Sequence, residues 1–180
     1  AETADAPKRI SVWNAENGKN VNQFFGSSSY FGYGFIDPAR PDEFYAHNTI
    51  WTIDWDTYTV NPHATIWRQV SPNHMMVCSP DAYKGHLRVF TNEHGQFAYG
   101  GANNGAVLSK RKGDIFQPIM AAFQIRRGKY GYHGEQFELI KDEERYQNGS
   151  YFWQDANDDG VVQHAEISKG GGSFKQVDRE

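Results

Sequence analysis

Short runs of β-forming residues, separated by glycine, asparagine, aspartate and proline, recur along almost the whole chain. The runs follow one another at intervals of roughly 8–12 residues, which is typical of sheets built from short strands joined by tight turns. Apolar residues nowhere keep the helical spacing of about 3.6 residues over several turns. The pattern therefore predicts an all-β fold, such as a sandwich, a barrel or a set of propeller blades.

The first hairpin is the clearest local prediction. Ile10 and Val12 alternate with polar neighbours, residues 14–18 supply turn residues, and residues 21–25 return as a strand. Further strands are predicted at 44–55, 59–69, 75–77, 86–91, 96–99, 106–110, 137–140 and 151–153. The apolar run within 115–125 is too short to be assigned by its period alone. The best helix candidate is a single turn at 165–169, which Gly170 ends.

Composition supports sheets and excludes some partners. Aromatic residues make up 15% of the chain, and the 18 glycines suit many turns. The net charge of −4 gives no basic surface for nucleic acid. Cys78 is the only cysteine, so the chain forms no internal disulfide. No apolar run approaches the roughly 18 residues that would predict a membrane span.

The 180 residues suffice for one domain with a sizeable core. Residues 1–8 are predicted to be a tail or linker, residues 9–168 the folded body, and residues 169–180 a flexible tail. The first residues, AETADAPKRI, lack the basic and apolar regions of a signal peptide. They fit the mature end of an exported protein and equally a cut inside a longer chain.

The stretch DANDDGVVQHAE, residues 155–166, matches a twelve-residue calcium loop at every position. Gly160 stands at position 6, where the backbone must turn sharply. Ca²⁺ takes six to eight oxygen ligands, and in such a loop they come from positions 1, 3, 5, 7, 9 and 12. Those positions hold Asp155, Asn157, Asp159, Val161 through its carbonyl, Gln163 and Glu166. The alternative is a solvated acidic turn.

The flanks of this EF-hand-like loop favour a structural role for calcium. Asn148-Gly149 would break any incoming helix, and the triple glycine after Lys169 cuts the outgoing one short. A sensor needs a pair of helices that opens when the ion binds. The loop is therefore interpreted as a staple that pins a strand end to the rest of the domain.

Three stretches resemble, in the same order, segments of NHL-type β-propeller proteins of planctomycete-like bacteria. They are RISVWNAENGKNVNQFFG, GYGFIDPARPDEFY and SYFWQDANDDGVVQHAEI, with GDIFQPIMAAF resembling a strand shortly before the calcium loop. The resemblance covers about residues 7–168. It implies an exported protein, periplasmic or extracellular, made of β-propeller blades with one EF-hand-like calcium loop. It implies no defined biochemical activity.

Blades need roughly 40–50 residues each, so the chain would hold three or four. That is fewer than most closed rings have. The resemblance therefore implies a partial or assembled propeller, which the rest of a longer chain or other chains would complete.

Aromatic residues in two glycine-rich loops, near basic residues, are candidates for contact with a protein or polysaccharide partner. Exposed rings can stack on sugar rings, whereas the alternative is that they cap the ends of the sheets. The candidates are Tyr30, Phe31, Tyr33, Arg126, Arg127, Tyr130 and Tyr132.

Catalytic residues are not identified. The stretch HMMVCSP, residues 74–80, offers soft ligands for copper but reads equally as a buried strand. Asp54 and Asp56 could serve a glycosidase only if the fold brought another acid near. The sequence favours a calcium-stabilised binding or scaffold module. The alternative is a propeller-based enzyme that acts on a glycan or carries a redox metal.

Overall fold

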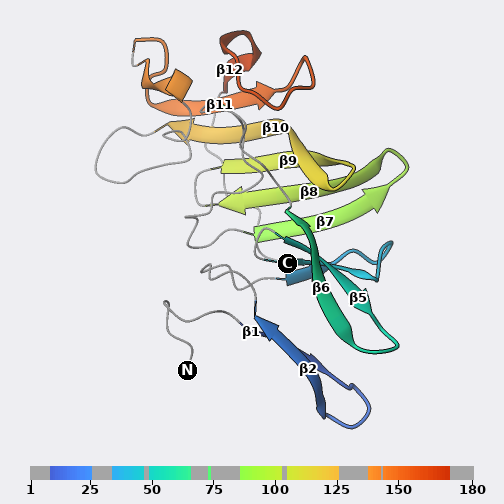
Figure 1. Ribbon diagram of the computed structural model, residues 1–180. Coiled ribbons are helices and arrows are strands. Elements are labelled where there is room, and N and C mark those ends of the chain that lie inside the picture. Colours follow the sequence, from blue (N-terminus) through green and yellow to red (C-terminus); the bar gives the residue numbers. More distant parts are fainter. Residues whose placement is uncertain are drawn as a thin grey trace.

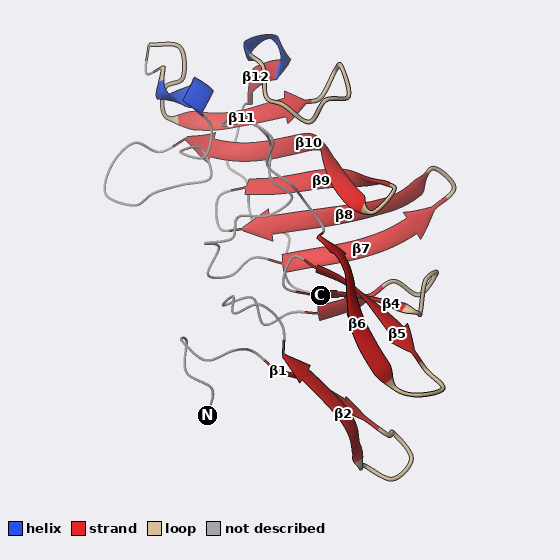
Figure 2. Cartoon of the chain, viewed as in Figure 1, coloured by secondary structure: helices blue, strands red, loops and turns tan. Residues whose placement is uncertain are grey.

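The computed structural model describes residues 9–25, 34–46, 49–65, 73, 86–102, 105–125, 138–142 and 144–170. In this part of the chain, antiparallel strands form three sheets, and two short 3₁₀ turns are the only helical elements (Figures 1 and 2). The all-β prediction is confirmed. None of the three sheets closes on itself within the described residues.

The first sheet is the predicted hairpin, β1 (Arg9–Trp13) and β2 (Asn20–Phe25). The side chain of Asn14 organises its turn, because Oδ1 accepts the backbone N–H groups of Glu16 and Asn17. The hairpin lies beside the β5–β6 turn, where the Asn22 amide donates to the Tyr58 carbonyl at 2.6 Å.

The second sheet is a meander of four strands in the order β3-β4-β5-β6. Its strands are β3 (Gly34–Ile36), β4 (Glu43–Ala46), β5 (Thr49–Asp54) and β6 (Thr59–Thr65). The single run predicted at 44–55 is thus two paired strands. The predicted turn after Asp54 is present, and the carboxylate of Asp54 accepts the N–H groups of Asp56 and Thr57.

The third sheet is a meander of six strands in the order β12-β11-β10-β9-β8-β7. Its strands are β7 (His86–Asn92), β8 (Gly95–Ala102), β9 (Gly105–Lys112), β10 (Ile115–Ile125), β11 (Gly149–Gln154) and β12 (Ile167–Gly170). The ambiguous run 115–125 is a strand. Its alternating burial along the first half shows one face turned to the core.

Two separate apolar clusters lie along the inner face of the six-stranded sheet. The first joins that sheet to the four-stranded one and contains Tyr45, Ile50, Val89, Ala98 and Phe116. The second lies at the β10–β11 end and contains Val107, Ala121, Phe123, Ile125, Tyr146, Tyr151, Trp153 and Val162. The sheet therefore has one core shared with its neighbour and another that supports the segment after β11.

A β-bulge interrupts β10 between these two clusters. Pro118 pairs with Ser109 and Met120 with Leu108, so Ile119 is the extra residue. Proline has no N–H to give to a ladder, and a bulge is one of the few interior sites that accept it. The bulge separates the half of β10 that pairs only with β9 from the half that also pairs with β11.

Three predictions about the end of the chain are wrong. The strand predicted at 137–140 is a 3₁₀ turn, η2 (Glu138–Lys141), over its described residues. The helical turn predicted at 165–169 is a 3₁₀ turn, η3 (His164–Glu166), followed by β12. The tail predicted at 169–180 begins inside β12, where Gly170 pairs with Ser150. Residues 1–8 and 171–180 lie outside the described residues.

Candidate metal centre and the inter-sheet network

The segment 155–166 forms a closed loop between β11 and β12, wound around the carboxylate of its first residue. The Asp155 side chain accepts the N–H of Gly160 at 2.8 Å and the N–H of Asp159 at 3.2 Å. Asp159 in turn accepts the N–H of Val161 at 2.7 Å. Gly160 has a φ of 71°, a conformation that glycine adopts without strain. The sharp bend predicted at position 6 is therefore present.

The last residue of the loop returns to its beginning. Oε1 of Glu166 accepts the N–H of Ala156 at 2.9 Å. Oε2 accepts the indole N–H of Trp153 at 2.8 Å and the N–H of Gln163 at 3.2 Å. Because Trp153 is fully buried, the position-12 carboxylate is fixed directly to the core.

The amide side chains at positions 3 and 9 converge on the position-5 carboxylate. Nδ2 of Asn157 and Nε2 of Gln163 each lie 2.9 Å from Oδ2 of Asp159. Rotation of each amide about its last torsion would exchange its nitrogen for its oxygen and break its hydrogen bond to Asp159, so a cation would have to replace these two bonds. Three of the predicted ligands, Asn157, Asp159 and Gln163, therefore contact one another through their side chains.

This donor set fits calcium better than a transition metal. Among the described residues, no three His, Cys, Asp or Glu side chains are grouped to hold a metal by themselves. A site in the loop would need the amide oxygens and the Val161 carbonyl as well as the carboxylates. Mixed carboxylate, amide and backbone oxygens are the ligands that Ca²⁺ takes.

Strand β10 holds the start of the loop in place. The N–H of Asp155 donates to the Ile119 carbonyl at 3.0 Å, so the bulge residue of β10 provides an acceptor for the loop. Nε2 of Gln117 donates to the Asp158 carbonyl at 2.5 Å, and Lys112 forms an ion pair with the Asp158 carboxylate.

A second attachment comes from Asn73. The N–H of Val162, at position 8, donates to the Asn73 carbonyl at 2.8 Å. Oδ1 of Asn73 accepts the N–H of Leu139 in η2 at 3.0 Å. Val162 itself is buried in the second apolar cluster and so anchors the loop to the core.

Reasoning from the sequence missed Lys112, Gln117, Ile119 and Trp153 as neighbours of the loop. Trp153 had a local signal, since it precedes the loop by two residues in an aromatic strand. The other three had none, because they come from a strand pair about 40 residues earlier in the chain.

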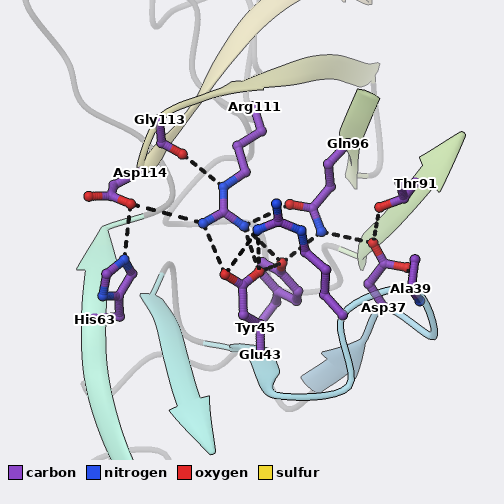
Figure 3. Close-up of polar contacts among 11 residues, drawn as sticks. Asp37, Ala39, Glu43, Tyr45, His63, Thr91, Gln96, Arg111, Gly113 and Asp114 are labelled. Carbon is purple, nitrogen blue, oxygen red and sulfur yellow. Dashed lines mark hydrogen bonds and ion pairs between the residues drawn. The ribbon is translucent and has the colours of Figure 1, made fainter. Parts of the chain in front are cut away.

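A buried polar network joins the four-stranded and six-stranded sheets (Figure 3). Arg111 on β9 donates to both carboxylate oxygens of Glu43 on β4, at 2.5 and 3.0 Å, and to Oε1 of Gln96 at 2.8 Å. The hydroxyl of Tyr45 also donates to Glu43. The side chains of Arg111 and Glu43 are each only 10% exposed, so this ion pair is largely removed from water.

Asp37 extends the network toward β7. Its Oδ2 accepts hydrogen bonds from the Thr91 hydroxyl at 2.5 Å and from Nε2 of Gln96 at 2.8 Å. At the other end, Nε2 of His63 on β6 lies 3.0 Å from Oδ1 of Asp114 in the β9–β10 turn. Polar contacts therefore link the two sheets from β7 to the β9–β10 hairpin.

These contacts favour the ionised forms of Asp37 and Glu43. Burial by itself raises the pKa of Asp37, but the hydrogen bonds from Thr91 and Gln96 outweigh it and leave the pKa below its usual value. Burial likewise opposes ionisation of Glu43, and Arg111 and Tyr45 lower its pKa overall. Burial and the neighbouring Glu43 raise the pKa of the Tyr45 hydroxyl, which stays protonated.

The lowered pKa of Asp37 predicts a loss of stability in acid. A group whose pKa is depressed on folding stabilises the fold above its ordinary pKa, here 3.8, and loses that contribution as the pH falls through the folded value. We expect the free energy of unfolding to fall as the pH drops below about 4. Urea denaturation at a series of pH values measures this slope.

The Asp37→Asn variant isolates the contribution of this acid. It should show a shallower dependence on pH in this range than the wild-type protein, whatever its overall stability. The matched control is Asp42→Asn, which removes one carboxylate from the exposed neighbouring turn. Equal slopes for Asp37→Asn and wild type would contradict the assignment.

The other predicted site residues are not brought together in the described part of the chain. The candidate partner-binding residues Tyr30, Phe31, Tyr33, Arg126, Arg127, Tyr130 and Tyr132 all lie outside it, as do the copper candidates His74, Met75, Met76 and Cys78. Asp54 and Asp56 lie in the exposed β5–β6 turn, where Asp54 accepts backbone N–H groups of its own turn. Comparison of the chain with protein-family models, curated proteins and solved structures gave no match.

Proposed function

We propose that the chain is a binding or scaffold module whose calcium loop fixes one end of a propeller-like assembly of sheets. The observation that carries this proposal is the closed loop 155–166: the Glu166 carboxylate accepts the N–H of Ala156 and the indole N–H of buried Trp153, and the backbone of Asp155 is bonded to β10. Asp155, Asn157, Asp159, Val161, Gln163 and Glu166 would hold the ion.

Bound calcium would act by offsetting charge and linking the loop to itself. The twelve residues contain four carboxylates within a short span, those of Asp155, Asp158, Asp159 and Glu166. Their mutual repulsion disfavours the closed loop, and a divalent cation among them removes it. The closed loop in turn holds Val162 and Trp153 in the second apolar cluster.

The sheets support a propeller built from more than these residues. The four-stranded meander β3–β6 has the strand number of a propeller blade, whereas the six-stranded meander has two strands more. Since no sheet closes within the described residues, further blades of a longer chain or of other chains would complete the ring. Periplasmic or extracellular location suits such a staple, because extracellular calcium modules work with weak affinities of about 10⁻⁴–10⁻³ M.

The outer face of the six-stranded sheet supports a binding role. Phe90, Met120 and Phe152 are each at least 40% exposed on the face turned away from the core. Phe90 stacks on Phe97, and Lys110 lies over the Phe97 ring. Exposed apolar residues beside cations suit a protein or polysaccharide partner that carries acidic groups.

Among the residues that the structure describes, no helix has the length and apolar character that a membrane crossing requires.

Calcium removal tests the staple. Chelation should lower the melting temperature, because a ligand that binds only the folded state stabilises it by mass action. At a free calcium concentration about 100-fold above the dissociation constant, the loss is about 2.7 kcal/mol. Differential scanning calorimetry with calcium and with excess chelator measures it.

The variant Asp155→Ala should abolish the response to calcium. The matched control is Asp56→Ala, which removes an exposed turn aspartate and should leave the response intact. The proposal fails if the melting temperature of the wild-type protein is the same with and without calcium.

A further inference from the structure

We infer that Gln117 and Lys112, both on the β9–β10 hairpin, are positioning residues for the calcium loop and act on its affinity in opposite directions. Gln117 holds the loop in its closed form before the ion arrives and so strengthens binding. Lys112 supplies a positive charge to the ion-free loop and so weakens binding. The inference rests on the proposed calcium site and assigns roles to two residues outside the loop.

Gln117 contacts the loop at two of its residues. Its Nε2 donates to the Asp158 carbonyl at 2.5 Å and lies 3.4 Å from Oδ1 of the same residue. The same nitrogen lies 3.5 Å from Oδ2 of Asp155, the first ligand. One amide group from β10 thus touches both the first ligand and the bend that follows it.

The residue that Gln117 holds has an uncommon backbone conformation. Asp158 has a φ of 65°, in the left-handed region that L-residues adopt at a cost of about 1–3 kcal/mol. On its carbonyl side the chain continues through Asp159 to Gly160 and Val161, whose positions depend on this turn. A contact from a strand that is fixed on β9 therefore favours the strained turn over extended alternatives.

Lys112 affects calcium binding through its positive charge beside the loop. Its ammonium pairs with the Asp158 carboxylate, which stands at position 4 and is outside the ligand set. In the ion-free loop this cation offsets part of the repulsion among the four carboxylates. When calcium binds, the same ammonium repels the ion, because both carry positive charge within a short distance.

The two residues therefore make distinguishable predictions. Gln117→Met removes the donor without changing charge and should weaken calcium binding by about fivefold, the size of one ordinary hydrogen bond. Lys112→Met should tighten binding by about threefold at low ionic strength, and the effect should disappear near 1 M salt. Without calcium, Lys112→Met should also have a lower melting temperature than wild type.

Isothermal titration calorimetry with CaCl₂, at low salt and in 1 M KCl, measures these affinities. The matched controls are Gln23→Met and Lys19→Met, which change the same residue types on exposed sites of the β1–β2 hairpin. Both controls should bind calcium as wild type does.

The outcomes separate the two proposals. If wild type does not bind calcium, the proposed staple fails and this inference fails with it. If wild type binds but Gln117→Met and Lys112→Met both match the controls, the positioning roles are overturned and the staple stands. A loss of affinity in both variants that is the same at both salt concentrations would overturn the charge role assigned to Lys112.

Discussion

Replacement of Arg111 by methionine is expected to lower the free energy of unfolding by about 3–5 kcal/mol. Methionine keeps much of the apolar stem but removes the guanidinium, and Glu43 is then left as a buried carboxylate without its main partner. Removal of one member of a buried ion pair is costly because the remaining charge has lost both water and its partner. Urea denaturation followed by far-ultraviolet circular dichroism measures the change.

A control and a double variant separate this explanation from loss of packing. Arg88→Met changes an exposed arginine on β7, and its effect should stay within about 0.5 kcal/mol. The double variant Glu43→Leu, Arg111→Met removes both charges and should recover much of the stability, since an apolar pair often replaces a buried ion pair at little cost. A double variant as unstable as the sum of the single variants would rule out the ion pair as the cause.

Truncation of Trp153 to alanine is the second change of this size, with an expected loss of about 3–5 kcal/mol. Trp153 is 0% exposed and lies at the centre of the second apolar cluster, paired with Ala121 on β10 and Ile167 on β12. Its removal leaves a large cavity, and Glu166 loses the indole donor that fixes it. Both effects act on the same end of the molecule.

Trp13→Ala is the matched control for this prediction. Trp13 lies at the end of β1 and is 60% exposed, so its truncation should cost less than about 1 kcal/mol. Trp153→Phe keeps most of the ring volume but not the N–H, and it should fall between the two. Equal stabilities for Trp153→Ala and Trp13→Ala would show that the second cluster does not support the fold.

Local patterns predicted most of the strands correctly. The first hairpin needed only the alternation around Ile10 and Val12 and the turn at Asn14, whose side chain binds its own backbone. Tight turns depend on a few neighbouring residues, so they can be read from sequence. The apolar run within 115–125 is too short for its period to assign a structure, and only its pairing with β9 and β11 shows that it is a strand.

Tertiary contacts explain the wrong predictions near the end of the chain. The segment after Glu166 has residues that tolerate a helix, but Ile167 pairs with Trp153 and extends the sheet instead. The Gln163 and Glu166 side chains close a capping box around a single 3₁₀ turn, which stops there. Such competition between local preference and sheet pairing is invisible without the neighbouring strand.

The two candidate sites differed in how far sequence could predict them. The six proposed calcium ligands lie within twelve residues, so their spacing alone indicated them, although binding itself stays a prediction. Glu43 and Arg111 are 68 residues apart, and Asp37 and Gln96 are 59 apart. No sequence pattern indicates a contact between residues so far apart in the sequence, and these pairs form only because the two sheets pack against each other.

The contacts around the bulge at Ile119 constrain the number of residues in this part of β10. Its carbonyl accepts the N–H of Asp155, while Gln117, two residues earlier, reaches Asp158. Insertion or deletion of one residue between Gln117 and Ile119 would turn either the Gln117 side chain or the Ile119 carbonyl to the opposite side of the strand, away from the loop. Natural variation in this region should therefore proceed by substitution, whereas insertions and deletions should gather in the hairpin turns.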